Sequence, residues 1–331
     1  MSELEFVAIG DIVTDEFIQL RSDRAVVNTT LTGRKTISMY FGDKLEYEGA
    51  VNVPAVGNSP NAAVSAKRLG LKTALVCDIG DDVGGVEIMD RLREEGIDTR
   101  FVDVQTGKET NHHYVLRYGA ERTILIKHEK YEYIVPDMGV PKWLYFSSVG
   151  EHGILYHHDI ARYVREHEGT RLAFQPGSFQ IQLGHDALRD VYEACELFFC
   201  NKEEAQQILA TDEKHVPTLL HRMRELGPTI PVITDGPAGA YALAEDGVWH
   251  MPMYPDPAPP VDRTGAGDAF SSTFTSALAL GLDVPTALRW GPVNSMSVVQ
   301  YIGAQEGLLS REQIETHLAQ APEDYVARKV V

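Results

Sequence analysis

The chain of 331 residues is poor in positive charge and in cysteine. It carries 30 Lys and Arg against 48 Asp and Glu, a formal net charge of −18. A nucleic acid requires a basic face, so this balance argues against a nucleic-acid partner. The three cysteines, Cys77, Cys195 and Cys200, form no C-x-x-C pair. They therefore indicate neither a disulfide framework nor a cysteine zinc site.

Long apolar runs are also missing. No stretch approaches the roughly 18 residues that a membrane span needs. The opening segment MSELEFVAIGD has neither the basic region nor the long apolar core of a signal peptide. We therefore expect a cytoplasmic protein with no membrane partner. The length suggests about two domains, or one large α/β domain with an appendage.

Several well-known catalytic motifs do not occur in the sequence. There is no Walker A loop of the form G-x-x-x-x-G-K-[ST], and no H-E-x-x-H or G-x-S-x-G run. No dinucleotide fingerprint G-x-G-x-x-G follows the first expected strand. These absences speak against a zinc protease, a serine hydrolase and an NAD enzyme.

Short apolar runs alternate with helical patterns along most of the chain, which predicts βαβ units, an α/β fold class and a mainly parallel sheet. The expected strands are Phe6–Gly10, Thr73–Cys77, Trp143–Phe146, Arg171–Phe174, Leu197–Phe199 and Ile230–Thr234. The expected helices are Ala62–Leu69, Val86–Leu92, Asp159–His167, Asp186–Tyr192, Glu203–Leu209, Val216–Leu226, Ala269–Leu280, Thr286–Tyr301 and Arg311–Leu318.

Two stretches interrupt this alternation, Thr36–Tyr47 and His112–Tyr133. Both are rich in β-branched and aromatic residues with hairpin-like glycine turns, and no crossover helix follows either. We expect a small antiparallel sheet that lies over the main sheet as a lid, with edge hairpins of the main sheet as the alternative. The predicted domains are a large one (1–12, 60–105 and 136–331) and a discontinuous β lid (13–59 and 106–135).

The most informative segment is Val261-Asp262-Arg263-Thr264-Gly265-Ala266-Gly267-Asp268-Ala269-Phe270. Two glycines permit a tight turn, and a helix is expected directly after them. Consecutive N–H groups at such a turn form a concave site for an anion, of which phosphate is the best candidate. Asp268 at the helix start suits a base, because the positive helix end should lower its pKa and keep it ionised. A plain helix cap is the alternative role for Asp268.

With this segment and several others, the sequence resembles the PfkB, or ribokinase-like, carbohydrate kinases. Asp262–Asp268 is similar to the family's D-T-x-G-A-G-D signature. Further similar motifs follow the family's order: Gly57–Ala63 with Arg68-Leu69-Gly70, then Ile79–Gly85, Asn201–Glu204, Thr234–Gly239 and Gly303–Gln305. The resemblance implies a three-layer α/β/α sandwich with a small β-sheet lid. It also implies ATP-dependent phosphorylation of a sugar-type hydroxyl.

The resemblance assigns roles to residues on both sides of the transfer. Asp268 would be the base, and the N–H groups of Gly265, Ala266 and Gly267 would hold the transferring phosphoryl group. On the nucleotide side it implies Asn201, Glu204, Thr234, Gly236, Gly239 and Asn294, with Glu204 organising Mg²⁺ through water. A capping box is the alternative for Asn201 and Glu204.

On the acceptor side, the resemblance implies that Asp15, Gly57, Asn58 and Asn61 bind the sugar, and a solvated lid residue is the alternative for Asp15. It also makes a K⁺ site plausible at Asp262, Thr264 and Gly303. The chain departs from the family at Val56, at Val13 and at Phe174–Ser178, which lacks the acid and the Arg of the D-x-N-x-R segment. This puts an acidic or phosphorylated acceptor in doubt, although Arg117 and Arg122 on the expected lid could still meet one.

Three functions remain open from the sequence: a sugar kinase, an adenosine-like nucleoside kinase and a catalytically silent sugar-binding relative. A nucleoside acceptor would need aromatic stacking, for which Phe17, Tyr40 and Phe41 are available. The apolar and aromatic content of the expected lid predicts a homodimer formed lid to lid. The residues concerned are Met39, Tyr40, Phe41, Tyr114, Ile124 and Ile126.

Overall fold

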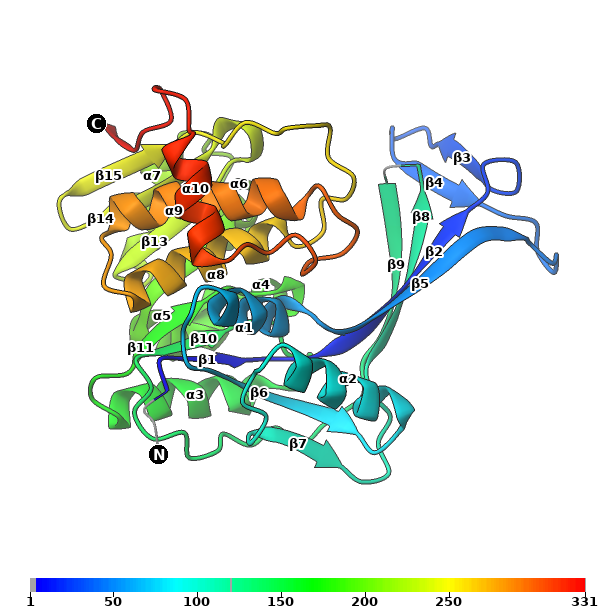
Figure 1. Cartoon of the computed structure of the whole chain (residues 1–331), viewed down its shortest axis with the longest axis horizontal. Coiled ribbons are helices and arrows are strands. Elements are labelled where there is room, and N and C mark those ends of the chain that lie inside the picture. Colours follow the sequence, from blue (N-terminus) through cyan, green and yellow to red (C-terminus); the bar gives the residue numbers. More distant parts are fainter. Residues whose placement is uncertain (1–3, 120, 331) are drawn as a thin grey trace.

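A ten-stranded sheet lies at the centre of the computed structural model, which describes residues 4–119 and 121–330 (Figure 1). Its inner strands, such as β1 and β10, are apolar and buried on both faces, whereas the edge strands β7 and β16 are partly exposed. Its order is β16-β15-β14-β13-β12-β11-β10-β1-β6-β7, and the strands from β13 to β7 are parallel. The bounds are β1 (Phe6–Ile9), β6 (Thr73–Gly80), β7 (Val102–Gln105), β10 (Trp143–Phe146), β11 (Arg171–Phe174), β12 (Cys195–Asn201), β13 (Ile230–Thr234), β14 (Ala240–Ala244), β15 (Gly247–Met251) and β16 (Arg328–Val330).

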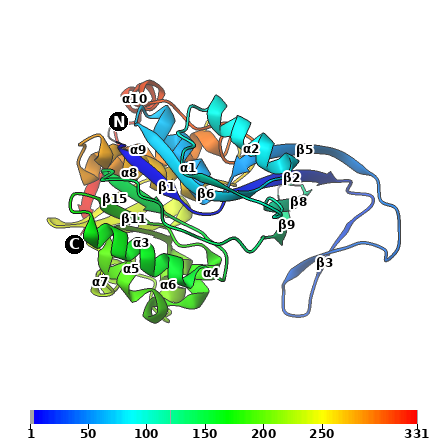
Figure 2. The same ribbon diagram turned by 90° about the horizontal axis from the view of Figure 1, so that it is seen from below.

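Helices cover both faces of this sheet, which makes the predicted three-layer α/β/α sandwich (Figure 2). One layer holds α1 (Asn58–Arg68), α2 (Val83–Glu94), α8 (Ala266–Ala279), α9 (Val284–Val298) and α10 (Arg311–Ala319). The other holds α3 (Ile154–Glu166), α4 (Ser178–Leu183), α5 (Arg189–Ala194), α6 (Lys202–Ile208) and α7 (Val216–Glu225). Within the described residues, no helix has both the length and the apolarity to cross a bilayer.

The expected elements are found, with some differences at their ends and at both edges of the sheet. The strands at 143–146, 171–174 and 230–234 have the predicted bounds. Helix α1 begins at Asn58 rather than Ala62, because Pro60 sits in its first turn, where a missing N–H costs no hydrogen bond. The antiparallel edge β14-β15-β16 and the parallel strand β7 at the opposite edge were not predicted.

The lid is a separate four-stranded sheet that projects from one end of the sandwich (Figure 1). It is formed by β2 (Val13–Leu20), β5 (Tyr47–Val56), β8 (His112–Tyr118) and β9 (Glu121–Lys127) in the order β5-β2-β8-β9. The expectation of a purely antiparallel lid is wrong, because β2 and β8 pair in parallel. Both strands leave the same end of the main sheet, so they run in the same direction.

The expected lid segment Thr36–Tyr47 does not join this sheet as a strand of its own. Only β4 (Lys35–Ser38) forms there, and it pairs with β3 (Val26–Thr29) in a two-stranded hairpin. This hairpin extends beyond the lid sheet, away from the sandwich (Figure 1). Both strands are mostly exposed. In this part of the chain, the lid sheet is therefore built by the flanking strands β2 and β5, which pair with each other and, through β2, with β8.

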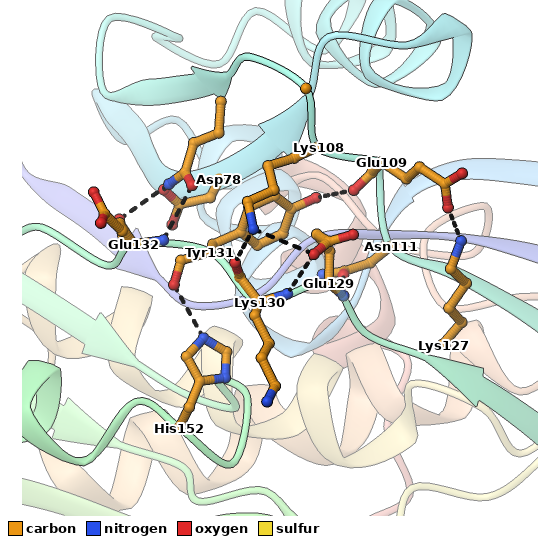
Figure 3. A network of polar contacts seen from close by, with 12 residues as sticks. Asp78, Lys108, Glu109, Asn111, Lys127, Glu129, Lys130, Tyr131, Glu132 and His152 are labelled. Carbon is orange, nitrogen blue, oxygen red and sulfur yellow. Dashed lines mark hydrogen bonds and ion pairs between the residues drawn. The ribbon is translucent and has the colours of Figure 1, made fainter.

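At the base of the lid, the connections β7–β8 and β9–β10 are tied to each other by polar contacts (Figure 3). Lys108 Nζ donates to the carbonyl oxygen of Lys130 at 2.8 Å, and the Tyr131 hydroxyl donates to the carbonyl oxygen of Glu109 at 2.7 Å. The Glu129 N–H donates to Asn111 Oδ1 at 2.8 Å. Two chain segments that lead into and out of the lid are thus held side by side.

Asp78 on β6 ends this network on the side of the main sheet. Its Oδ1 accepts a hydrogen bond from Gln105 Nε2 at 2.7 Å, and the same amide nitrogen donates to the carbonyl oxygen of Glu132 at 3.0 Å. Burial raises the pKa of Asp78 to about 7; the Gln105 hydrogen bond lowers it, and the nearby carboxylates of Asp103 and Asp11 raise it. A carboxyl group at this position holds a proton into the neutral range.

We predict that Asp78 makes the folded protein less stable as the pH rises. Between its unfolded pKa of 3.8 and the folded value of about 7, the folded state keeps a proton that the unfolded state has lost. Stability therefore falls through this range, by about 1.4 kcal/mol per pKa unit at most. In urea unfolding, Asp78→Asn should have a higher free energy of unfolding than the original chain, and the difference should grow from pH 5 to pH 8. The exposed Asp324→Asn serves as control, and a gain independent of pH would contradict the prediction.

Candidate active site

The glycine-rich segment forms the N-terminus of α8, and its shape depends on Gly265. This residue precedes the helix with φ 79°, in the left-handed region, and offers no side-chain cap. A Cβ at this position would lie 2.4 Å from the Cβ of Ala304, so only glycine fits. The first N–H groups of the helix, those of Ala266 and Gly267, have no partner within the helix and border a cavity. The structure thus has an anion-binding geometry at the predicted position.

Asp268, in the first turn of α8, is held by three side-chain amides. Asn58 Nδ2 donates to Oδ1 and Asn61 Nδ2 to Oδ2, both at 2.8 Å, and Gln175 Nε2 donates to Oδ1 at 3.0 Å. Gln175 is itself oriented, because its Oε1 accepts hydrogen bonds from the hydroxyls of Tyr145 and Ser271. The predicted base and two of the predicted acceptor residues therefore meet at one point.

The expectation that the helix end lowers the pKa of Asp268 is wrong. Burial raises the pKa of this carboxyl group, and the hydrogen bonds from Asn61, Gln175 and Asn58 offset only part of that effect. The residue nevertheless keeps a partly exposed face. A carboxylate that is accessible and has a raised pKa is a stronger proton acceptor than an exposed aspartate.

A cavity of about 410 Å³ lies beside the N-terminus of α8. Three residues predicted for the nucleotide, Thr234, Gly236 and Gly239, line it together with Ala266 and Gly267. Other lining residues are Pro237, Tyr254, Arg263, Phe270, Pro292, Ser295 and Met296. The predicted phosphoryl-holding turn and the predicted nucleotide residues therefore border a single space.

Asn201 and Glu204 form the capping box that was the alternative to a magnesium role. The Glu204 N–H donates to Asn201 Oδ1, and the Asn201 N–H donates to Glu204 Oε2, each at 2.8 Å. Burial raises the pKa of Glu204, and the charge of Asp268 contributes in the same direction. A magnesium role for Glu204 stays a prediction.

Asn294 is fully buried on α9 and does not line the cavity. Its Nδ2 donates to Thr273 Oγ1 at 2.7 Å, and its Oδ1 accepts the Leu309 N–H at 2.9 Å. These bonds join α8, α9 and the segment before α10. Its neighbour Ser295 lines the cavity instead, so the contact of Asn294 with a nucleotide stays a prediction.

The three residues predicted for K⁺ lie together around the Asp262 carboxylate. Its Oδ1 accepts hydrogen bonds from the Thr264 N–H and hydroxyl, and its Oδ2 accepts one from the Gly303 N–H at 3.2 Å. Burial raises the pKa of Asp262, but these bonds and the charge of Arg122 outweigh it, so that the pKa is lowered. Arg122 Nη1 comes from the lid and lies 3.6 Å from Asp262 Oδ1. The lid thus meets the segment that begins the glycine-rich turn.

On the acceptor side, Asp15 lies on the lid strand β2, and Gly57 caps α1 with φ 121°. Two histidines that we did not predict as site residues, His113 and His128, lie between Asp15 and Asp11. The sequence offered one signal, the pair His112-His113. Adjacent residues of a strand point to opposite faces, and these two do: His112 lies against Glu16 and His113 against Asp15.

Comparison with known proteins agrees with this geometry. The family described as pfkB family carbohydrate kinase matches residues 27–311. A ribokinase of Bacillus subtilis is 26% identical over 80% of this chain and 87% of its own. A nucleoside kinase of Methanothermobacter thermautotrophicus is 26% identical over 76% of this chain and 80% of its own. The structure of Arabidopsis thaliana ribokinase complexed with ribose and ATP aligns with a TM-score of 0.79 and 17% identity, over 96% of this chain and 99% of that one.

The fold and the site define a phosphotransferase whose acceptor is a hydroxyl group. The chain belongs to the pfkB family of carbohydrate kinases, and among them it is a ribokinase-fold kinase of the sugar and nucleoside class.

We predict that Gly265→Ala destabilises the fold. Alanine in the left-handed region costs about 1–2 kcal/mol, and the overlap with Ala304 adds to this cost. The matched control is Gly267→Ala, where the nearest atom to a new Cβ, Gln175 Nε2, is 4.0 Å away. In urea unfolding, only Gly265→Ala should have a lower free energy of unfolding than the original chain. Equal stability of the two variants would contradict the steric argument.

Proposed function

We propose that the chain transfers the γ-phosphoryl group of ATP to a hydroxyl of a neutral carbohydrate, with Asp268 as the base. The observation that supports this most directly is the position of Asp268. Its carboxylate, in the first turn of α8, accepts hydrogen bonds from the amides of α1, and the two residues before it, Ala266 and Gly267, line the cavity that Thr234, Gly236 and Gly239 also line. Asp268 accepts the proton of the acceptor hydroxyl while the hydroxyl oxygen forms the new bond to the γ-phosphorus. The bond between the γ-phosphorus and the β-phosphate oxygen breaks, and ADP leaves.

Charge on the transferring group is met mainly by N–H groups. In this proposal, those of Gly265, Ala266 and Gly267 would donate to the oxygens of the transferring group, as in an oxyanion hole. A magnesium ion on the nucleotide supplies further neutralisation, and Glu204 would hold it through water. The Asp262, Thr264 and Gly303 segment is the proposed K⁺ site, because a cation there would sit directly beside the glycine-rich turn.

A neutral sugar fits the acceptor side better than an acidic one. The residues around the acceptor position are amides and carboxylates: Asn58, Asn61, Gln175, Asp11 and Asp15. The Arg of the family's D-x-N-x-R segment has no counterpart in Phe174–Ser178. Arg122, the lid arginine that reaches the site, is directed to Asp262. Carboxylates accept hydroxyl hydrogens well and repel an acidic acceptor.

A nucleoside kinase is the second candidate, and Phe179 favours it. Its partly exposed ring meets that of His128 edge-on at 6.1 Å, close to Asp11, where it could stack on a base. The other aromatic residues give less support. Phe17 is buried, while Tyr40 and Phe41 lie after β4, outside the lid sheet. A panel of ribose, fructose, 2-keto-3-deoxygluconate and nucleosides, assayed with ATP, Mg²⁺ and K⁺, decides between the two.

We also propose that the chain forms a homodimer through the lid. The six residues that suggested it, Met39, Tyr40, Phe41, Tyr114, Ile124 and Ile126, are all more than a third exposed. Leu125 on the edge strand β9 is exposed as well. Such an apolar surface on an edge strand is covered in most soluble proteins.

We predict that Asp268→Asn lowers kcat by 10²-fold to 10⁴-fold, the usual contribution of a general base. Asparagine keeps the size of the side chain but cannot take the hydroxyl proton. Binding of ATP, measured by calorimetry, should stay within a few fold, because the cavity residues are unchanged. Full turnover by Asp268→Asn with the best acceptor of the panel would refute the proposed role of Asp268.

We predict that Ile126→Asp converts a lid dimer to monomers, because a charge would be buried at the interface. Sedimentation velocity should show the original chain at about twice the mass of the variant. Leu155→Asp is the matched control, since Leu155 is an exposed apolar residue on α3, away from the lid. A monomeric original chain, or a dimeric Ile126→Asp variant, would contradict this interface.

A further inference from the structure

A row of four side chains runs from the lid to the main sheet. His113 Nδ1, on β8, lies 3.2 Å from Asp15 Oδ1 on β2. His113 Nε2 lies 3.1 Å from His128 Nε2, and the two rings are stacked. His128 Nδ1 lies 3.1 Å from Asp11 Oδ2, directly after β1. Asp15 and His113 belong to the lid strands, whereas Asp11 belongs to the loop that follows a main-sheet strand.

The contacts of this row determine how many protons the two rings carry. His128 Nδ1 is hydrogen-bonded to Asp11 Oδ2, and His113 Nδ1 lies at ion-pair distance from Asp15 Oδ1. A proton on each Nδ1 satisfies both contacts, because a bare lone pair at either position would be repelled by the carboxylate. The two Nε2 atoms face each other, so one of them must donate and the other accept. The pair therefore holds three ring protons and one positive charge. A fourth proton would set two N–H groups against each other, and loss of the shared proton would oppose two lone pairs.

The surroundings of the row contain few other titratable groups. Asp11 also accepts a hydrogen bond from the Tyr133 hydroxyl at 2.8 Å, and that hydroxyl accepts the Gly150 N–H. The buried carboxyl group of Asp78 interacts electrostatically with Asp11. From α4, the ring that packs on His128 is that of Phe179, which does not titrate. In the part of the chain that the structure describes, no three His, Cys, Asp or Glu side chains converge as metal ligands.

Asp15 depends on this row for its orientation. Its Oδ1 is shielded from solvent and accepts no hydrogen bond of regular geometry from the residues that the structure describes, so the ion pair with His113 Nδ1, 3.2 Å away, is the contact that compensates its charge. Oδ2 is left as the oxygen that can accept a hydroxyl hydrogen. The row also links β8 of the lid, through His128, to Asp11 of the main domain. Losing the shared proton or adding one would release both Asp15 and this link.

We propose that His113 and His128 are positioning residues that share one proton, and that this shared proton orients Asp15 and fastens the lid over the acceptor. Acceptor binding is then strongest in the pH range in which the pair holds that proton. The inference about the acceptor rests on the proposed function, in which Asp15 binds the acceptor. The proton count does not, since it follows from the distances alone.

The first test measures the protons directly and needs no activity. Long-range ¹H–¹⁵N NMR of the full chain with ¹⁵N-labelled histidine reports whether each ring nitrogen is protonated. The variants His113→Gln and His128→Gln assign the signals. We expect protonated Nδ1 on both rings and two Nε2 signals that share one proton, over a pH range with changes at both ends. Two independent neutral rings, each titrating once, would overturn the proposal even if the chain is an active kinase.

The second test measures acceptor kinetics from pH 5 to pH 9 with the acceptor that the panel identifies. Glutamine keeps hydrogen-bonding capacity but does not titrate. His113→Gln should raise KM for the acceptor about tenfold, the effect of weakening one hydrogen bond to a charged group. It should leave KM for ATP unchanged and flatten the pH profile of kcat/KM for the acceptor. His112→Gln is the matched control, one residue away on the opposite face of β8.

The outcomes separate this inference from the proposed function. An unchanged acceptor KM and pH profile in His113→Gln, with full activity, would overturn the positioning role and leave the kinase assignment intact. Equal effects of His112→Gln and His113→Gln would also overturn it, because they would reflect general damage to the lid. If no acceptor on the panel is phosphorylated, the NMR measurement still decides on the shared proton.

Discussion

The site depends on one buried carboxylate that must be held without a positive charge. Asp268 receives amide hydrogen bonds from α1 and from the end of β11, while its backbone begins α8. Amides can orient a carboxylate without neutralising it, so it remains able to take a proton. This requires α1 and α8 to begin at the point where β11 ends. The parallel sheet provides that, because the carboxyl ends of its strands meet at one edge.

The same requirement explains why an acidic chain can handle a phosphate donor. Its net charge of −18 leaves few cations to spare. The N–H groups at the start of α8 and the left-handed Gly265 supply a binding geometry for phosphate that adds nothing to the count of Lys and Arg. Much of the acidic surplus can then lie on the solvated surface. The site itself uses only a few carboxylates, each held by specific hydrogen bonds or ion pairs.

The lid is tied to the sandwich by two different kinds of contact. At its base, backbone and side-chain bonds such as Tyr131 to Glu109 and Lys108 to Lys130 join two chain crossings. Elsewhere the lid meets the main domain through ionisable side chains: His128 with Asp11, and Arg122 with Asp262. Contacts of the first kind join neighbouring backbone segments, whereas those of the second kind join side chains on separate elements.

Local patterns in the sequence determined the α/β class, most strands of the parallel sheet and the glycine-rich turn before α8, because alternation, capping and positive φ are properties of short segments. The antiparallel strands were harder to predict from the sequence, because β14, β15 and the lid strands β2 and β5 carry weaker strand patterns. Only the tertiary structure decided what surrounds each carboxylate. Burial raised the pKa of Asp268 where the helix end alone predicted a decrease. The tertiary structure also brought His128 next to His113. Contacts between residues fifteen positions apart depend on how the strands pair and not on spacing along the chain.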